Sequence, residues 1–166
     1  MRCLNFQAEI VGLQGSGKST LLAQLHEHLQ KRSFKSHFVS LPQDRESYRS
    51  LLRQAFQQST AGCVILFDGI ERLGFFQRRA LIRRTRASGL VVTKHYRGKL
   101  PPLIQLRTSQ QLMTQLLNDL DLDQPEIIQA GKLAFEKHQG NIRDALRDLY
   151  DQCADGKFNK FLANVA

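Results

Sequence analysis

The sequence contains no apolar run that approaches the roughly 20 residues needed to cross a membrane. Polar residues interrupt the apolar ones near the N-terminus, which argues against a secretory signal. Its three cysteines, Cys3, Cys63 and Cys153, form no CxxC pair, so neither a zinc site nor a disulfide framework is indicated. We therefore expect a cytoplasmic protein with no membrane contact.

Acidic residues are missing from one segment, residues 72–99, which we call the basic segment. It holds nine Lys and Arg residues, and the 15 basic residues outside it equal the 15 acidic residues of the chain. The net charge of +9 therefore arises in this segment. Three roles stay open for it: an arginine finger for a neighbouring subunit, a nucleic-acid contact, or a solvated face.

A glycine-rich stretch near the N-terminus matches the pattern G-x-x-x-x-G-K-[ST] in full. Glycines allow close approach of the backbone to an anion, and successive N–H groups then point at phosphates. Lys18 would contact the β- and γ-phosphates, and the Ser19 hydroxyl would ligate Mg²⁺. The residues expected to bind nucleotide are Gly12, Gln14, Gly15, Ser16, Gly17, Lys18, Ser19 and Thr20.

Patterns of apolar residues on either side of this loop give the required context. Residues 6–11 predict a strand, and leucines from Leu21 to Leu29 recur at helical spacing. Further strands are expected at 36–41, 63–67, 90–93 and 103–106, and helices at 46–58 and 75–87. From Ser109 onward only helices are expected, with Ser109 and Asn141 as caps. We expect an α/β core, 1–107, with a parallel sheet, and a helical lid-like subdomain, 108–166.

A second chemical element follows the most apolar expected strand, as Asp68-Gly69-Ile70-Glu71. A carboxylate at the carboxyl end of a buried parallel strand points to the crevice where phosphates bind. Asp68 would hold Mg²⁺, directly or through water, and Glu71 would orient or deprotonate the attacking water. An ordinary Asp-Gly turn is the alternative.

At this point the chain resembles the P-loop ATPases of the additional-strand, catalytic-glutamate division, nearest to AAA+ and STAND-type ATPases. The resemblance implies a five-stranded sheet of order 5-1-4-3-2 and a helical lid. It also implies that Thr93, or His95 just beyond, matches sensor 1, and that Arg143 matches the sensor-2 arginine that faces the nucleotide. Here the glutamate comes three positions after the metal aspartate rather than next to it.

These features predict a Mg²⁺-dependent ATP-binding protein, a slow ATPase that alternates between ATP and ADP and signals to a protein partner or a second copy. Adenine is favoured because the chain lacks the N-K-x-D motif of GTPases. One alternative is a small-molecule kinase. Another is a nucleotide-gated nucleic-acid-binding module that uses the basic segment, where Phe75, Phe76 and Tyr96 lie among the charges.

Overall fold

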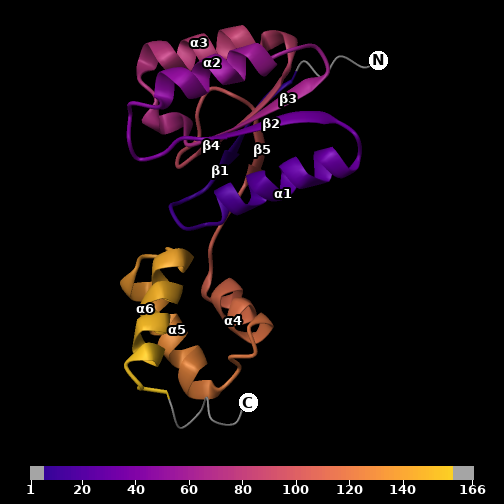
Figure 1. Cartoon of the computed structure of the whole chain (residues 1–166). Helices are drawn as coiled ribbons and strands as arrows, with labels where there is room; N and C mark the ends of the chain where they lie inside the picture. The colour runs from indigo at the N-terminus through magenta and orange to yellow at the C-terminus, as the bar shows by residue number, and fades with distance from the viewer. Residues whose placement is uncertain (1–5, 159–166) are drawn as a thin grey trace. The chain divides into compact units, whose positions relative to one another are not determined.

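The computed structural model describes residues 6–158 and contains five strands and six α-helices in that range. The contacts between residues divide the chain into two compact units. The first comprises the residues up to Gly12 with Gly17–Leu106, and the second comprises Leu13–Ser16 with the residues from Arg107 onward. Figure 1 labels the elements of both units. They are β1 Gln7–Val11, α1 Lys18–Lys31, β2 Lys35–Ser40, α2 Tyr48–Gln58, β3 Cys63–Asp68, α3 Phe75–Arg84, β4 Gly89–Lys94, β5 Pro102–Gln105, α4 Gln110–Asp119, α5 Pro125–Lys137 and α6 Ile142–Ala154.

A parallel five-stranded sheet forms the first unit, in the order β2-β3-β4-β1-β5. Read from the other edge this is 5-1-4-3-2, so the expected sheet order is confirmed. The insertion of β4 between β1 and β3 matters for the site. Because all strands run the same way, the carboxyl ends of β1, β4 and β3 lie at one edge of the sheet.

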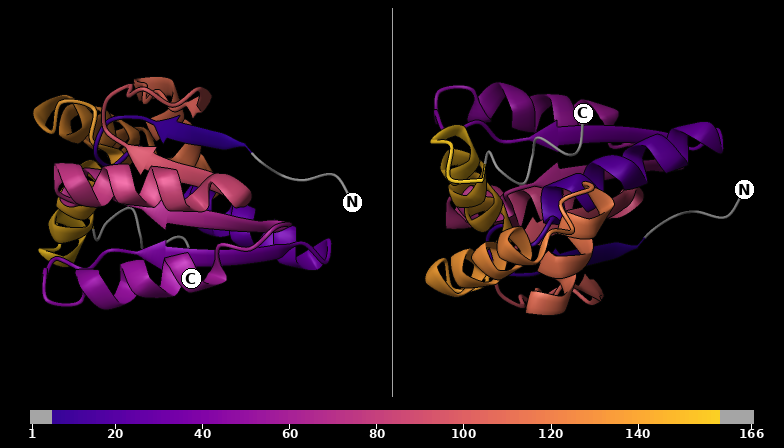
Figure 2. Two further views of the ribbon diagram at one scale, coloured as in Figure 1. Left: turned by 90° about the horizontal axis from the view of Figure 1, so that it is seen from above. Right: turned by 90° about the horizontal axis from the view of Figure 1, so that it is seen from below.

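Helices cover both faces of this sheet. Leu22 of α1 packs against Ile10, Val64 and Leu66 on one face, and α2 and α3 pack on the other around Phe67 and Leu81. In the left view of Figure 2, α2 and α3 lie along the sheet, and the indigo strand β1 lies on the side of α3 that faces away from α2. The residues of β3 from Cys63 to Phe67 are all buried, which explains their unbroken apolar sequence.

The basic segment differs from its expected helix in one detail. The α-helix α3 ends at Arg84, and a 3₁₀ turn, Thr85–Ala87, continues to Ser88. The Thr85 hydroxyl donates to the Leu81 carbonyl at 2.9 Å, and the Ser88 hydroxyl donates to the Thr85 carbonyl at 3.1 Å. These side-chain bonds satisfy backbone groups at the end of the helix in place of further α-helical bonds.

The second unit is a helical cluster made by α4, α5 and α6. Its core includes Met113, Leu117, Ile127 and Leu149. Both expected caps are confirmed, because the Ser109 hydroxyl accepts the Leu112 N–H at 3.1 Å and the Asn141 carbonyl oxygen accepts the Asp144 N–H at 3.2 Å. No helix within residues 6–158 has the length and apolar character required to span a membrane.

Candidate functional site

The glycine-rich loop connects β1 directly to α1. Gly15 and Gly17 have φ angles of 73° and 86°, in the left-handed region that favours glycine. The Gly12 N–H donates to the Lys94 carbonyl at 3.1 Å, which ties the start of the loop to β4. The loop therefore adopts a conformation that depends on its glycines, and it leads straight into a helix N-terminus.

Lys18 is the first residue of α1 and is only 7% exposed. Its ammonium donates to the Gly12 carbonyl at 2.6 Å, across the loop. A buried ammonium at a helix N-terminus adds to the positive field of the helix, so this position favours an anion. Among the other predicted contacts, Ser16 and Ser19 are half-buried, and Gln14 and Thr20 are exposed.

Asp68 ends β3, and Thr93 of β4 holds its carboxylate. The Thr93 hydroxyl is buried, donates to Asp68 Oδ1 at 2.5 Å and accepts the Gly69 N–H at 2.8 Å. Gly69 has a φ of 81°, so a residue tolerant of this conformation is needed directly after the aspartate. The turn thereby fixes the carboxylate at the edge of the sheet, with its second oxygen left to other ligands.

Glu71 and His95 also meet in this unit, from the segments that follow β3 and β4. His95 Nδ1 lies 3.3 Å from Glu71 Oε1, and Glu71 Oε2 is buried without a hydrogen-bond partner. The structure therefore separates the two residues that matched sensor 1, since Thr93 contacts Asp68 and His95 contacts Glu71. An unpartnered, buried carboxylate oxygen is suited to accept a hydrogen bond from a water molecule.

Arg143 belongs to the second unit, where it is exposed in the first turn of α6. Its neighbour Asp144 bonds to the cap residue Asn141 through both its side chain and its N–H. The sensor-2 role of Arg143 stays a prediction.

Magnesium would take a hydroxyl and a carboxylate from this chain. Ser19 and Asp68 supply oxygen donors of the kind that Mg²⁺ prefers, with phosphates and water completing the shell. Within residues 6–158 no cluster of three or more His, Cys, Asp or Glu side chains could hold a metal ion. The hydroxyl and carboxylate of Ser19 and Asp68 fit Mg²⁺ better than zinc, which prefers sulfur and nitrogen ligands.

Sequence reasoning missed Glu9, which lies in the middle of β1 and is fully buried. Its Oε1 accepts the Gly98 N–H, and its Oε2 is buried with no hydrogen-bond partner. The sequence does contain a signal, because Glu9 is a charged residue inside an otherwise apolar part of a strand. Such a residue is rarely fully buried unless it has a partner.

Two solved structures share the fold of this chain. One is described as the crystal structure of a DNA replication initiation factor, with a TM-score of 0.54, 14% identity, and coverage of 87% of this chain and 58% of the other. The other is AMPPCP-bound DnaA from Aquifex aeolicus, with a TM-score of 0.58, 14% identity, and coverage of 87% and 54%. This chain thus spans little more than half the length of these structures, and such low identity shows the fold alone.

No curated protein matches the sequence. A family model does match, over residues 8–162, and its description is AAA domain. That range includes the glycine-rich loop, Asp68, Thr93 and the three helices of the second unit. The sheet order with β4 between β1 and β3, the loop and the family match agree, and the chain belongs to the AAA domain family of P-loop NTPases of the AAA+ type.

Proposed function

We propose that this protein binds ATP with Mg²⁺ and hydrolyses it slowly, as a switch between two nucleotide states. One observation carries the proposal: β4 lies between β1 and β3, and its Thr93 bonds to Asp68 while its Lys94 bonds to the glycine-rich loop. The phosphate-binding loop and the acidic residue are therefore linked through one strand. The neighbour described as AMPPCP-bound DnaA is consistent with an adenine nucleotide.

Each residue has a defined task in this proposal. Loop N–H groups and Lys18 hold the phosphates, while Ser19 and Asp68 hold the metal. When bound, Mg²⁺ neutralises charge on the phosphate oxygens. Glu71 accepts a hydrogen bond from the attacking water, and His95 restrains the Glu71 carboxylate through the contact at 3.3 Å.

Calorimetry with Mg²⁺ and ATP tests the binding step. Lys18→Ala removes the buried ammonium and is expected to abolish the heat of ATP binding. Lys31→Ala, at the exposed last residue of the same helix, is the matched control and should bind as the wild type does. If Lys18→Ala binds ATP normally, or if the wild type gives no heat with ATP, ADP or GTP, the proposal is wrong.

Phosphate release tests the hydrolytic step. Glu71→Gln keeps the shape of the side chain and should retain ATP binding while turnover falls by about 10²- to 10⁴-fold. Arg143→Ala, if the sensor-2 prediction holds, should lower turnover while the helical unit stays folded. Unchanged turnover in Glu71→Gln would remove Glu71 from the mechanism.

The cellular setting and the partner are also proposals. We propose a reducing cytoplasm as the setting, in which the thiols of Cys63 and Cys153 would stay free. Turnover that rises with protein concentration would indicate an arginine supplied by a second copy. Turnover that stays constant would leave a different protein as the recipient of the signal.

A nucleic-acid-binding module is a second candidate, favoured by the surface of α3. Phe75 and Phe76 are 71% and 82% exposed, and Arg79 and Arg83 follow on the next turns. Exposed aromatics beside arginines are typical of single-strand contacts. Phosphate release stimulated by DNA or RNA, with a steep dependence on salt, would favour this candidate.

A further inference from the structure

A pocket of about 490 Å³ lies in the first unit between α3 and the strands β1 and β4. Its volume falls within the about 300–1,000 Å³ of small-ligand sites. Ile70, Phe75, Ile82, Val92 and Leu100 supply its apolar lining. It is separate from the glycine-rich loop, none of whose residues line it.

The pocket exists because the chain takes a short route from β4 to β5. Residues 95–101 contain no helix, so the face of β1 that carries Glu9 is covered by the Gly98 loop and not by a helix. A Cβ added at Gly98 would lie 2.6 Å from Glu9 Oε2 and 2.3 Å from Lys94 Nζ. The ends of the Lys94 and Glu9 side chains thus lie directly against the Gly98 backbone, and a larger residue at this position would require them to shift.

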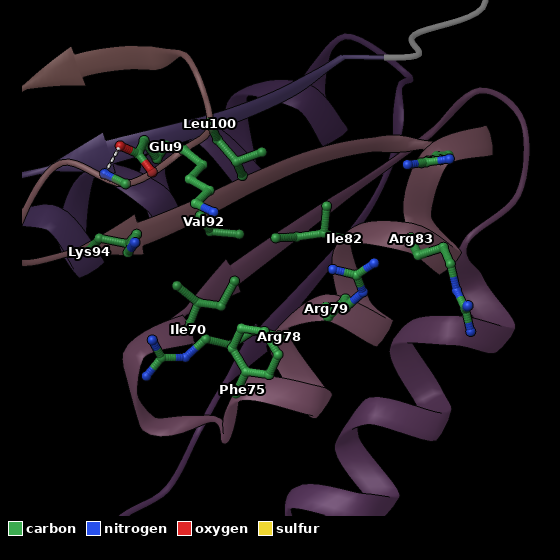
Figure 3. A pocket seen from close by; sticks show the side chains of 13 residues that line it. Glu9, Ile70, Phe75, Arg78, Arg79, Ile82, Arg83, Val92, Lys94 and Leu100 are labelled. Atoms are coloured by element: carbon green, nitrogen blue, oxygen red, sulfur yellow. Dashed lines mark hydrogen bonds between the residues drawn. The ribbon is translucent and has the colours of Figure 1, made fainter.

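The two ends of this pocket differ in chemistry. Figure 3 shows Glu9 on β1 at one end and Arg83 on α3 at the other, with Arg79 between them. Arg86 and Lys99 add further positive charge to the lining, and Glu9 is its single acidic residue. The Lys94 ammonium lies at the same end as Glu9, next to Gly98, but forms no ion pair with the Glu9 carboxylate. The cations favour an anion, whereas the free Glu9 Oε2, which only accepts as a carboxylate, favours a ligand that donates N–H or O–H.

We propose that this pocket binds one nucleotide of a single-stranded nucleic acid, with an amine-bearing base at Glu9 and its phosphates at the arginines of α3. A nucleotide meets both demands at once, because its base is flat, neutral and donates through its amine while its phosphate is anionic. An anion without a hydrogen-bond donor would satisfy the arginines but would leave Glu9 Oε2 without a partner. The base must be unpaired, because a base held in a duplex stays stacked between its neighbours and cannot enter a pocket.

This inference deepens the second candidate function, by naming the site and the base chemistry that it would read. Cytosine carries an exocyclic amine, whereas thymine presents a carbonyl and a methyl group instead. The two are pyrimidines of similar size, so the comparison tests the replacement of the amine by a carbonyl, with one added methyl group. We expect wild-type protein to bind oligo-dC about tenfold more tightly than oligo-dT, because one hydrogen bond to a charged group stabilises a complex by about this factor.

Glu9→Gln is the decisive variant. Gly98 N–H still needs an acceptor, so the glutamine carbonyl faces Gly98 and its NH₂ group faces the pocket. A donor in place of an acceptor should abolish or reverse the dC preference without loss of total binding. Fluorescence anisotropy with labelled strands of about 12 nucleotides, without ATP, measures both affinities. Unchanged calorimetry with ATP and unchanged circular dichroism establish that the variant is folded.

Neutralising the cationic end gives a different signature. Arg79→Ala with Arg83→Ala should weaken dC and dT equally and reduce the salt slope by about 0.7 for each phosphate that the protein no longer neutralises. Lys31→Ala with Arg32→Ala removes the same charge at the exposed end of α1 and should change little. Equal weakening in both double variants would overturn the assignment of the phosphates to α3.

The outcomes separate the possible failures. Absence of salt-dependent binding to either strand refutes both the pocket and the second candidate function. Binding with no dC preference, or a preference that survives in Glu9→Gln, overturns the pocket alone. Binding of dCMP as tight as that of the strand would identify a free nucleotide, and not a strand, as the source of the same chemistry.

Discussion

Thr93→Val tests how the acidic residue at the end of β3 is held. Valine has nearly the shape of threonine and suits a strand, so burial alone predicts no loss at this 1% exposed position. The hydrogen bonds predict otherwise. The change removes a bond to the Asp68 carboxylate and leaves the Gly69 N–H without its partner, at a combined cost of about 2–4 kcal/mol.

Thr93→Ser is the matched control, because it keeps the hydroxyl and loses one methyl group, at about 1 kcal/mol. Hydrogen exchange of the amides in β3 and β4 reports on the first unit by itself. These amides should exchange about 30- to 900-fold faster in Thr93→Val but only about 5-fold faster in Thr93→Ser. A valine variant as protected as the serine variant would refute the reasoning.

Three further predictions concern the backbone and the second unit. Gly69→Ala and Gly62→Ala should each cost about 1 kcal/mol because both glycines have φ above 80°, whereas Gly74→Ala, at −67°, should change unfolding midpoints little. Ser109→Ala should destabilise α4 by about 1 kcal/mol, measured by exchange of its first-turn amides. Lys137, His138 and Gln152 lower the pKa of Asp148 from 3.8 to about 2, so an NMR titration should show this midpoint, and Lys137→Ala should raise it. Because the pKa is lower in the folded state, the stabilisation is present above about pH 3.8 and is lost as the pH falls towards 2.

Local pattern predicted the order of elements well, and for a physical reason. The buried strand Cys63–Asp68 must be apolar on both faces, and a phosphate-binding loop must supply glycine where φ is positive. Caps at Ser109 and Asn141 are equally local, since each side chain bonds to an N–H three residues away. The sheet order followed from the resemblance to P-loop ATPases and is confirmed.

Local sequence patterns could not predict the contacts between residues that are distant in the chain. Nothing in the local sequence says that the Thr93 hydroxyl joins Asp68 and Gly69, or that His95 meets Glu71. Glu9 is the sharpest case, because a lone glutamate in a strand gives no indication of which loop covers it. The absence of a helix between β4 and β5 leaves that covering to Gly98.

The sequence by itself determined that a glycine-rich loop joins a strand to a helix, because the conformations of glycine and the spacing of apolar residues are local properties. Only the tertiary structure decided which polar groups meet, because strands neighbouring in the sheet come from segments dozens of residues apart. That packing places Thr93 beside Asp68 and encloses Glu9 in a pocket lined by the arginines of α3.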